Sequence, residues 1–318
     1  MDGYASIQFD ELGEIDHEWK EAIVFRNEER IVTQLYRKTN GGYQWRDWVT
    51  AYYRGDPPTS GVDPLSIRLP KIPDHFTPVE GVRSWPQGEE LLRLVKAELG
   101  DHGLVGVFCG TSMLLGNNKD ILEYADYPER FHEKRDRLLD YFEKRFSKLM
   151  SLDCKPDFIS TGGSGTLVFQ SPAIFRELAL PIVKKVTALC KAVGIPSQIH
   201  SCGPEAELVK ICAEETDLTL IDPLEISPMG DCDLKKIKQL YGDKLVLKGN
   251  LHTTDVMLFG SANDVINASK QAIDDAAEGG KFILSTGDQC GRDTPDENIF
   301  AMVETAKNYG RYPLRKGG

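Results

Sequence analysis

The chain has 318 residues, of which 41% are hydrophobic and 27% charged, and this composition is typical of a globular protein with a buried core. Its net charge of −11 argues against nucleic-acid binding, which needs basic patches. The longest apolar runs fall far short of the ~18 residues of a membrane span, and the N-terminus lacks the pattern of a secretion signal, so we expect no membrane partner.

The first 80 residues differ from the rest of the chain. Two candidate hairpin strands lie at 22–25 and 30–36, a possible third strand lies at 44–50, and proline-rich connections follow at 56–64 and 70–78. This irregular spacing does not produce clean βα units. We therefore expect an N-terminal cap or insertion over residues 1–80 and a main domain over residues 81–318.

From about residue 80 onward, short apolar runs alternate with longer amphipathic segments. The runs lie at 103–110, 156–163, 196–203, 218–225, 244–251 and 281–287. Their near-continuous apolar character suits parallel strands that are buried on both faces. One intervening helix is expected to run from Ser171-Pro172 to about Val193 and to stop at Gly194, because serine suits the N-cap and proline the first turn.

Repeated βα units imply either a doubly wound sheet or a (β/α)₈ barrel. A barrel needs eight strands, and the main domain offers six. The two architectures share one property that matters for function, because both gather reactive groups at the carboxyl ends of their strands.

Metal-binding residue types lie where two of these strands end. His200 and Cys202 end one strand, and Cys290 follows another. One imidazole and two thiolates are a strong ligand set for Zn²⁺, and three protein ligands leave one position open for chemistry. The alternative is a buried polar cluster or chance. The seven cysteines are odd in number, which favours a reducing cytoplasm over a disulfide framework.

Further polar residues end the neighbouring strands. Glu225 is a candidate fourth zinc ligand that substrate would displace, although pairing with a helix N-terminus explains a carboxylate at this position equally well. Asn250 and His252 suit hydrogen bonding around the site better than ligation.

The segment from Ser160 through Gly163 and Ser164 is rich in glycine and follows a predicted strand. Such a loop can cradle a phosphate, but this one lacks both the Walker lysine and the dinucleotide-binding spacing. We therefore interpret it as a loop that makes room for the substrate.

Several motifs fit a known family. They are Ser171-Pro172 at a helix start, His200-Ser201-Cys202-Gly203, Lys248-Gly249-Asn250, Thr294-Pro295-Asp296-Glu297-Asn298 and Tyr309-Gly310-Arg311-Tyr312. With these motifs the sequence resembles the uroporphyrinogen decarboxylase-like superfamily over roughly residues 85–313. The resemblance implies a (β/α)₈ TIM-type barrel. Because the family's first strand has no counterpart here, we expect a barrel that is open or incomplete at its N-terminus.

The superfamily has two chemical branches. True decarboxylases carry an arginine-rich substrate motif near the N-terminus, which has no counterpart in this sequence, whereas zinc-dependent methyltransferases carry His-x-Cys and a late cysteine. The resemblance to the second branch implies that His200, Cys202 and Cys290 bind zinc and that Glu225 can reach the metal. It also implies a cobalamin-bearing corrinoid protein as the partner.

The expected function is zinc-dependent transfer of a methyl group between a small methylated donor, such as a methoxylated aromatic, and the corrinoid protein. Glu225 and Asn250 are the expected catalytic residues, and Ser160, Gly163 and Ser164 are expected to contact the cofactor. Three alternatives stay open: methyl transfer from methylcobalamin to a thiol, uroporphyrinogen decarboxylation, and a non-catalytic barrel subunit. A homodimer is possible.

Overall fold

The computed structural model describes residues 20–26, 30–39, 42–53, 88–291 and 293–314; within the first three ranges, Ile23 is the one residue whose side chain is described. The chain divides into two compact units, one from Gly3 to Gln87 and the other containing Gly88 to Gly318. The two units are described separately.

The first unit contains a three-stranded antiparallel sheet. Its strands are β1 (Lys20–Arg26), β2 (Arg30–Thr39) and β3 (Gly42–Tyr53), in the order β1-β2-β3. The hairpin strands predicted at 22–25 and 30–36 lie within β1 and β2, and the third predicted strand lies within β3. The proline-rich connections at 56–64 and 70–78 lie outside the described residues.

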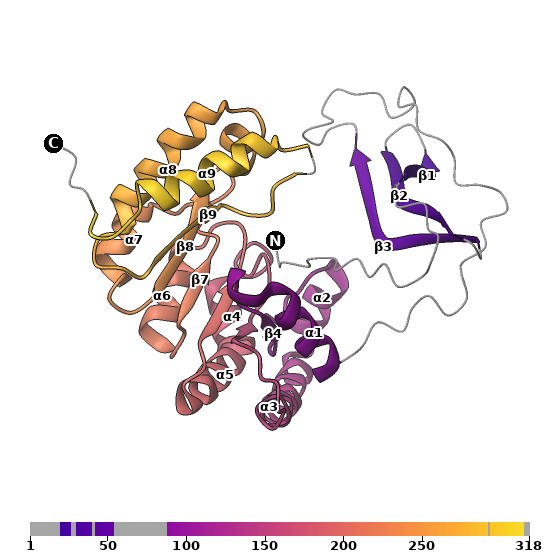
Figure 1. The fold of residues 1–318 in the computed structure, drawn as a ribbon. Coiled ribbons are helices and arrows are strands. Elements are labelled where there is room, and N and C mark those ends of the chain that lie inside the picture. Colours follow the sequence, from indigo (N-terminus) through magenta and orange to yellow (C-terminus); the bar gives the residue numbers. More distant parts are fainter. Residues whose placement is uncertain (1–19, 27–29, 40–41, 54–87, 292, 315–318) are drawn as a thin grey trace. The chain divides into compact units, whose positions relative to one another are not determined.

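The second unit is built on a parallel sheet of six strands whose spatial order equals their order in the chain (Figure 1). The strands are β4 (Gly106–Phe108), β5 (Phe158–Thr161), β6 (Ser197–His200), β7 (Leu220–Asp222), β8 (Val246–Leu251) and β9 (Phe282–Thr286). This order is that of a (β/α)₈ barrel and confirms the expected fold class. Among the described residues the sheet is open, because β4 pairs only with β5 and β9 only with β8.

Helices alternate with these strands. They are α1 (Glu89–Leu99), α2 (Asn118–Asp126), α3 (Pro128–Met150), α4 (Pro172–Leu178), α5 (Leu180–Val193), α6 (Ala206–Glu215), α7 (Leu234–Tyr241), α8 (Ala262–Ala276) and α9 (Asp296–Asn308), with a 3₁₀ turn η2 (Gly100–His102) and a π-helical turn η3 (Thr253–Leu258). In the described part of the chain, no helix has both the length and the apolar character needed to cross a membrane.

One predicted helix differs from the structure. The segment from Pro172 to Val193 forms two helices, α4 and α5, that meet at Ala179. The cause is Pro181, which has no N–H to donate to the preceding turn and therefore starts a new helix. The predicted end at Gly194 is confirmed, since this residue takes the left-handed conformation of a helix C-cap.

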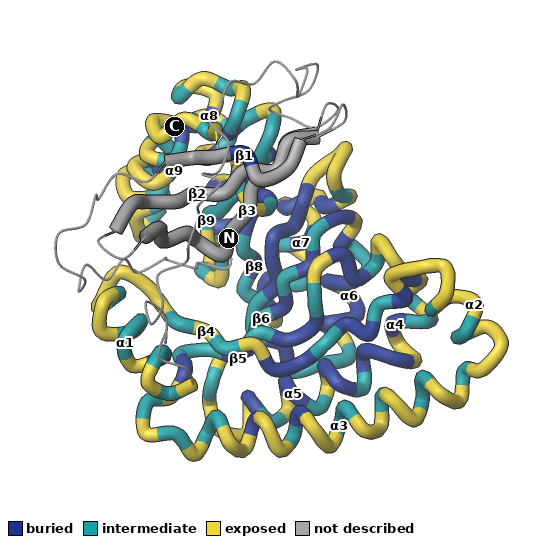
Figure 2. Tube along the Cα trace, turned by 90° about the vertical axis from the view of Figure 1, so that its right-hand side faces the viewer, coloured by how far each residue is buried: buried dark blue, intermediate teal, exposed yellow. Residues whose placement is uncertain are grey.

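The core lies between the sheet and the helices that cover one of its faces. Ile159, Ile199, Ile221 and Leu247 are fully buried on successive strands, and each contributes about 1.5–3 kcal/mol of hydrophobic free energy. Figure 2 shows buried residues along the strands and α5, whereas α3 exposes most of its surface. Because side chains alternate along a strand, the neighbours of these residues face the other side of the sheet.

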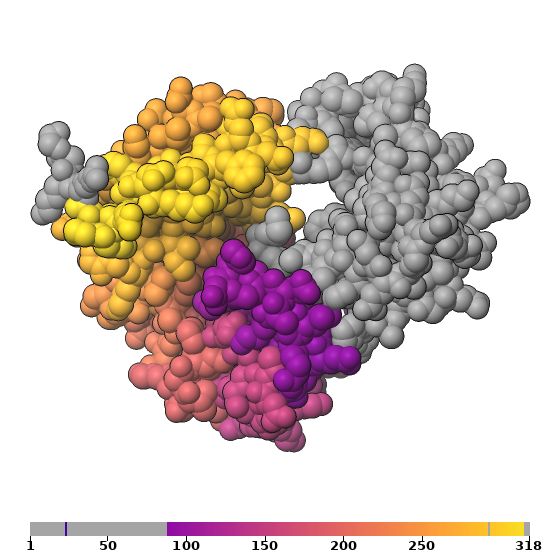
Figure 3. Space-filling view, viewed as in Figure 1, coloured from indigo at the N-terminus to yellow at the C-terminus, as the bar shows by residue number. Residues whose placement is uncertain are grey.

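The C-terminal motifs anchor α9 and the chain after it. Asn298 is buried, and its Nδ2 donates to the carbonyl oxygens of Met257 (2.9 Å) and Gly260 (2.8 Å), at the end of η3. The Tyr309 hydroxyl donates to Asp274 on α8 (2.9 Å). Helix α9 otherwise lies at the surface (Figure 3). The motif that contains Asn298 therefore fixes the turn that follows β8.

The start of α4 gives a stability prediction. The Ser171 hydroxyl accepts the N–H of Ile174 (3.3 Å) as the N-cap. We expect Ser171→Ala to lower the free energy of unfolding by about 1 kcal/mol, measured by urea denaturation. The control is Ser147→Ala in the exposed part of α3, where the hydroxyl bonds only the carbonyl oxygen of Glu143 and its loss is expected to be near neutral. Equal losses in the two variants would contradict the capping role.

Candidate metal centre

His200 is positioned by strand register. It is the last residue of β6 and pairs with Asp222, the last residue of β7. Its Nδ1 lies 3.2 Å from Asp222 Oδ2, and Lys248 Nζ on β8 lies 2.9 Å from the same oxygen. When Nδ1–H donates to a carboxylate, Nε2 carries the lone pair of the ring, which is the usual arrangement of a metal-binding histidine.

The Asp222 carboxylate is 3% exposed and is compensated on both oxygens. Gln198, on the same face of β6 as His200, donates to Oδ1 at 2.5 Å. Burial alone would raise the pKa of Asp222, but the hydrogen bond from His200 and the charge of Lys248 together hold it below its ordinary value. Asp222 therefore stays ionised and fixes the imidazole in place.

Cys202 follows β6 in a tight turn. Gly203 has φ +94°, a conformation that favours glycine, and a Cβ there would lie 2.4 Å from Val168 Cγ2. The Cys202 thiol shares a hydrogen bond of 2.6 Å with the Ser164 hydroxyl. Burial is the main cause that raises the pKa of Cys202; the hydrogen bond from Ser164 lowers it, and the nearby charge of Asp288 raises it further.

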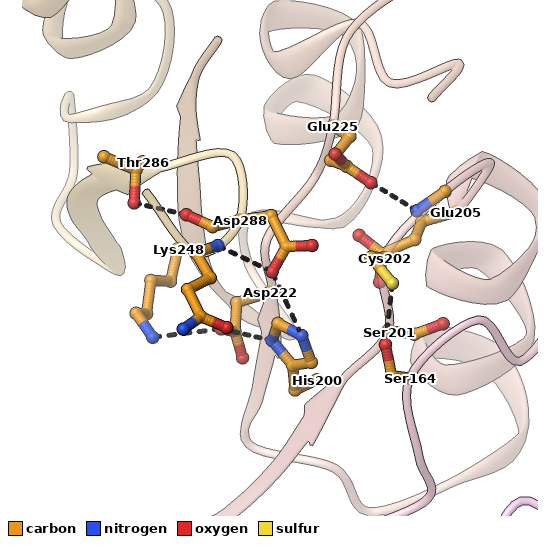
Figure 4. Close-up of polar contacts among 12 residues, drawn as sticks. Ser164, His200, Ser201, Cys202, Glu205, Asp222, Glu225, Lys248, Thr286 and Asp288 are labelled. Carbon is orange, nitrogen blue, oxygen red and sulfur yellow. Dashed lines mark hydrogen bonds and ion pairs between the residues drawn. The ribbon is translucent and has the colours of Figure 1, made fainter. Parts of the chain in front are cut away.

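The third member of the cluster is Asp288, in the loop after β9. His200, Cys202 and Asp288 each offer one ligand atom, and these atoms all lie within 4.8 Å of one another. Figure 4 shows His200 between Asp222 and Asp288, with His200 Nε2 lying 3.5 Å from Asp288 Oδ1. Imidazole, thiolate and carboxylate are all ligands of zinc, so this donor set fits a metal with one position left open.

The loop after β9 is held by its backbone. The Thr286 hydroxyl donates to the carbonyl oxygen of Asp288 (2.7 Å), and the N–H of Gly287 donates to the carbonyl oxygen of Leu251 (2.6 Å). The N–H of Gln289 donates to Asp288 Oδ1 (2.7 Å). These bonds direct the Asp288 carboxylate towards His200.

Cys290, the third zinc ligand expected from the sequence, is not part of this group of three. It packs, half-buried, against the hydrophobic core. Burial raises the pKa of its thiol more than the neighbouring hydroxyl groups of Thr286 and Thr294 lower it. Zinc ligation by Cys290 stays a prediction.

Glu225 and Asn250, the expected catalytic residues, line one pocket together with His252 and Gly287. Both are buried, at 5% and 7% exposure. One Glu225 oxygen accepts the N–H of Gly203, which links this carboxylate to the turn that carries Cys202. Burial is the main cause that raises the pKa of Glu225; the bond from Gly203 lowers it, and the charge of Asp288 raises it.

The three residues expected to contact a cofactor have different surroundings. The Ser164 side chain reaches Cys202, as described above. The carbonyl oxygen of Gly163 accepts the hydroxyls of Ser112 (3.3 Å) and Thr166 (2.6 Å), and that of Ser160 accepts the N–H of Cys109 (2.7 Å). The two contacts of Gly163 stabilise the loop, and the contact of Ser160 links β5 to the residue after β4. Cofactor binding by any of the three stays a prediction.

The sequence interpretation missed three residues of this site: Asp222, Lys248 and Asp288. Their position in the sequence could have indicated them, because Asp222 lies in the predicted strand at 218–225 and Lys248 in the predicted strand at 244–251. Asp288 comes two residues before Cys290. A carboxylate is a weaker signal than His or Cys, because acidic residues are common at solvated strand ends.

Strands in sequential order, each pair joined through helices, with polar side chains at the carboxyl ends, define a (β/α)-barrel protein whose site has the position usual for barrel enzymes. The chain belongs to the uroporphyrinogen decarboxylase family, because residues 89–309 match the family described as "Uroporphyrinogen decarboxylase (URO-D)".

Relatives carry two different names. A uroporphyrinogen decarboxylase of Thermosynechococcus vestitus is 24% identical over 260 residues, which are 78% of this chain and 72% of the relative. A methylcobamide:CoM methyltransferase, MtbA of Methanosarcina mazei, is 30% identical over 137 residues, 42% of this chain and 37% of the relative. The match therefore spans little more than a third of that methyltransferase.

A solved structure, described as a methyltransferase from Methanosarcina mazei, superposes with a TM-score of 0.52 at 16% identity. The match covers 70% of this chain and 64% of the other. At this identity the likeness establishes the shared fold.

Glu205 lies beneath the site, directly before α6, and is fully buried. Its Oε2 accepts the N–H of Leu224 (2.7 Å), and its Oε1 has no hydrogen-bond partner among the described residues. Burial is the main cause that raises its pKa well above 4.5; the bond from Leu224 lowers it, and the charges of Asp222, Glu225 and Asp231 raise it. Burial therefore favours the neutral, protonated form of Glu205 in the folded protein.

This assignment predicts a pH dependence. Because the pKa in the folded state lies above the unfolded value, the contribution of Glu205 to stability is fully present below about pH 4.5 and is lost as the pH rises towards the folded pKa, by up to ~1.4 kcal/mol per pH unit. Glu205→Gln mimics the neutral acid, so its advantage over the wild type should grow from pH 5 to pH 8 in urea unfolding. Parallel curves would contradict the assignment, and Glu214→Gln, exposed on the same helix, is the control.

Proposed function

We propose that the chain is a zinc-dependent methyltransferase that transfers a methyl group between a small methylated donor and a corrinoid protein. The observation that carries the proposal is the convergence of His200, Cys202 and Asp288 at the carboxyl edge of the sheet, where their ligand atoms all lie within 4.8 Å of one another. The kinship with methylcobamide:CoM methyltransferases supports the corrinoid as the second reactant.

His200 would bind the metal through Nε2, because Nδ1 is engaged by Asp222. Cys202 would bind as a thiolate. The loop after β9 offers Asp288, which lies in the cluster, and Cys290, two residues later. We favour Cys290 as the third ligand because zinc prefers a soft thiolate to a carboxylate as its ligand. Asp288 would remain beside His200. Two thiolates and an imidazole then give a site of zero formal charge.

Zinc bound in this set would act as a Lewis acid and lower the pKa of a coordinated thiol or hydroxyl group. The chain's own residues orient this chemistry. Asp222 and Lys248 fix His200, while Glu225 and Asn250 line the adjoining pocket where the methyl donor would lie. A neutral centre suits a thiolate or phenolate that must stay reactive.

We favour the demethylating direction, with a methoxylated aromatic as the donor. The O–CH₃ bond breaks and its electron pair stays on the oxygen, while cobalt(I) of the corrinoid supplies the pair that forms the Co–CH₃ bond. The corrinoid protein would approach at the carboxyl edge of the sheet, because His200 and Cys202 lie there and are partly exposed. Ser164, beside Cys202, lies on the same approach.

Uroporphyrinogen decarboxylation is the second candidate, because a uroporphyrinogen decarboxylase is the relative that matches the larger share of this chain. That reaction uses no metal, so metal content separates the two functions. A zinc-free protein that decarboxylates uroporphyrinogen would replace the methyltransferase proposal.

The ligand assignment predicts the zinc content of variants. Cys290→Ser should weaken zinc binding by more than about 100-fold, and Asp288→Asn should weaken it less, since the loss of an outer partner costs about 10–100-fold. The measurement is zinc stoichiometry after dialysis against a graded chelator. Cys154→Ser, at another half-buried cysteine, is the control. A larger loss in Asp288→Asn than in Cys290→Ser would make Asp288 the third ligand.

The methyl-transfer reaction itself can be followed by the spectrum of free cob(I)alamin, with guaiacol as the methyl donor. We expect loss of the cobalt(I) absorption only with zinc-loaded protein. Glu225→Gln should keep its zinc and react about 100-fold more slowly, the scale of a lost acid–base group. An unchanged rate would reduce Glu225 to a structural role, and failure of transfer by the zinc-loaded wild type across methoxylated donors would refute the proposed function.

A further inference from the structure

His252 is held in one tautomer by its own backbone surroundings. It follows β8 directly and is the N-cap of η3. Its Nδ1 accepts the N–H groups of Thr254 (3.3 Å) and Asp255 (2.9 Å). A ring nitrogen that accepts two hydrogen bonds carries no proton, so the neutral imidazole must carry its proton on Nε2.

Among the residues that the structure describes, this Nε2–H has no acceptor. The His252 side chain is 8% exposed, and within the described part of the chain Nε2 has no hydrogen-bond partner. Asp255 Oδ2 lies 3.9 Å away, which is too far for a hydrogen bond, and its side chain is 76% exposed. Because buried polar groups are nearly always paired, an unpaired one needs an explanation.

The pocket supplies that explanation. His252 lines it together with Glu225, Asn250, Thr253 and Gly287, and Ile226 and Met229 add two apolar side chains to the wall. The empty space is about 170 Å³ and continuous with solvent, and its interior has room for about one oxygen-sized group. The body of a ligand would then lie over Ile226 and Met229, which are 36% and 53% exposed.

The position of His252 is held by contacts on both sides. The turn that it caps is fixed at its far end by the two hydrogen bonds from buried Asn298 to Met257 and Gly260. Leu251 before it pairs with β9. The Nε2–H is therefore a preorganised donor, and preorganisation lowers the ordering that a ligand must impose on binding.

We propose that His252 Nε2–H donates a hydrogen bond to the ether or phenol oxygen of an aryl substrate whose ring packs against Ile226 and Met229. A neutral donor beside the carboxyl group of Glu225, which itself lies near the charge of Asp288, suits an uncharged oxygen, because an anionic ligand would meet like charge. This inference rests on the proposed function, whose methyl donor it narrows to an uncharged aromatic oxygen compound.

Two substitutions separate the donor from the cap. In His252→Asn the amide oxygen can replace Nδ1 and keep the turn, but the Nε2–H is lost. In His252→Gln the amide nitrogen can reach the Nε2 position, but the cap is lost. We expect guaiacol to bind His252→Asn about five- to tenfold more weakly than the wild-type chain, the scale of one hydrogen bond. We expect His252→Gln to bind guaiacol within about twofold of wild type and to melt at a lower temperature.

The binding titrations use the zinc-loaded full chain without a corrinoid. Toluene, which has no oxygen, should bind the wild type and His252→Asn alike, and Asp255→Asn should bind guaiacol like the wild type. Nitrogen NMR of the labelled histidine should show the Nε2–H tautomer, with a shift of that nitrogen when guaiacol is added.

The inference is overturned if guaiacol binds the wild type and His252→Asn equally, if guaiacol does not bind the wild type, or if NMR shows the proton on Nδ1. Failure of the proposed function would look different. In that case guaiacol would still bind through His252, but no methyl group would reach cob(I)alamin.

Discussion

The buried Asp222 carboxylate is the constraint on which the site depends. Its two oxygens accept hydrogen bonds from Gln198 and His200 on β6 and from Lys248 on β8. One anion on β7 thereby links three neighbouring strands (Figure 4). A buried charge is tolerated only when it is paired and hydrogen-bonded, and removing one partner leaves the rest uncompensated. The direction of the His200 ring, and therefore of its Nε2, follows from this arrangement.

The two faces of the same sheet carry different residues: one face packs in the hydrophobic core, and the other carries polar residues of the site. Residues such as Ile199 and Ile221 face the helices and are fully buried, while Gln198, His200 and Asp222 alternate with them on the opposite face. Period-two alternation thus gives one strand both a core side and a polar side. The carboxyl ends then add the turn with Cys202 and the loop with Asp288, where the backbone can approach closely because glycines stand at 203 and 287.

Much of this arrangement could be predicted from sequence alone. The six apolar runs became six strands. His200 and Cys202 were predicted as metal ligands because their residue types carry metal chemistry and both end one run, and the structure brings them together with Asp288. These features depend on local pattern. The family resemblance is confirmed by the match over residues 89–309.

The remaining features depend on tertiary structure. Asp288 lies near His200, whereas Cys290 lies outside the group. Hydrogen bonds from Thr286 to Asp288 and from Gly287 to Leu251 on β8 fix the loop in this arrangement. The three contacts of Asp222, with Gln198, His200 and Lys248, depend on the register of three strands. The His252 Nε2, which has no hydrogen-bond partner among the described residues, owes its position to the π-helical turn after β8, and such a turn gives no periodic signal in the sequence.

The central claim is that a metal binds where His200 and Cys202 converge. Zinc K-edge X-ray absorption of the zinc-loaded chain tests it most directly, because sulfur and light-atom ligands differ in distance, at about 2.3 Å and about 2.0–2.1 Å. The account predicts one zinc per chain with both sulfur and nitrogen or oxygen ligands. A chain that binds no stoichiometric zinc, or zinc surrounded by light atoms alone, would contradict it.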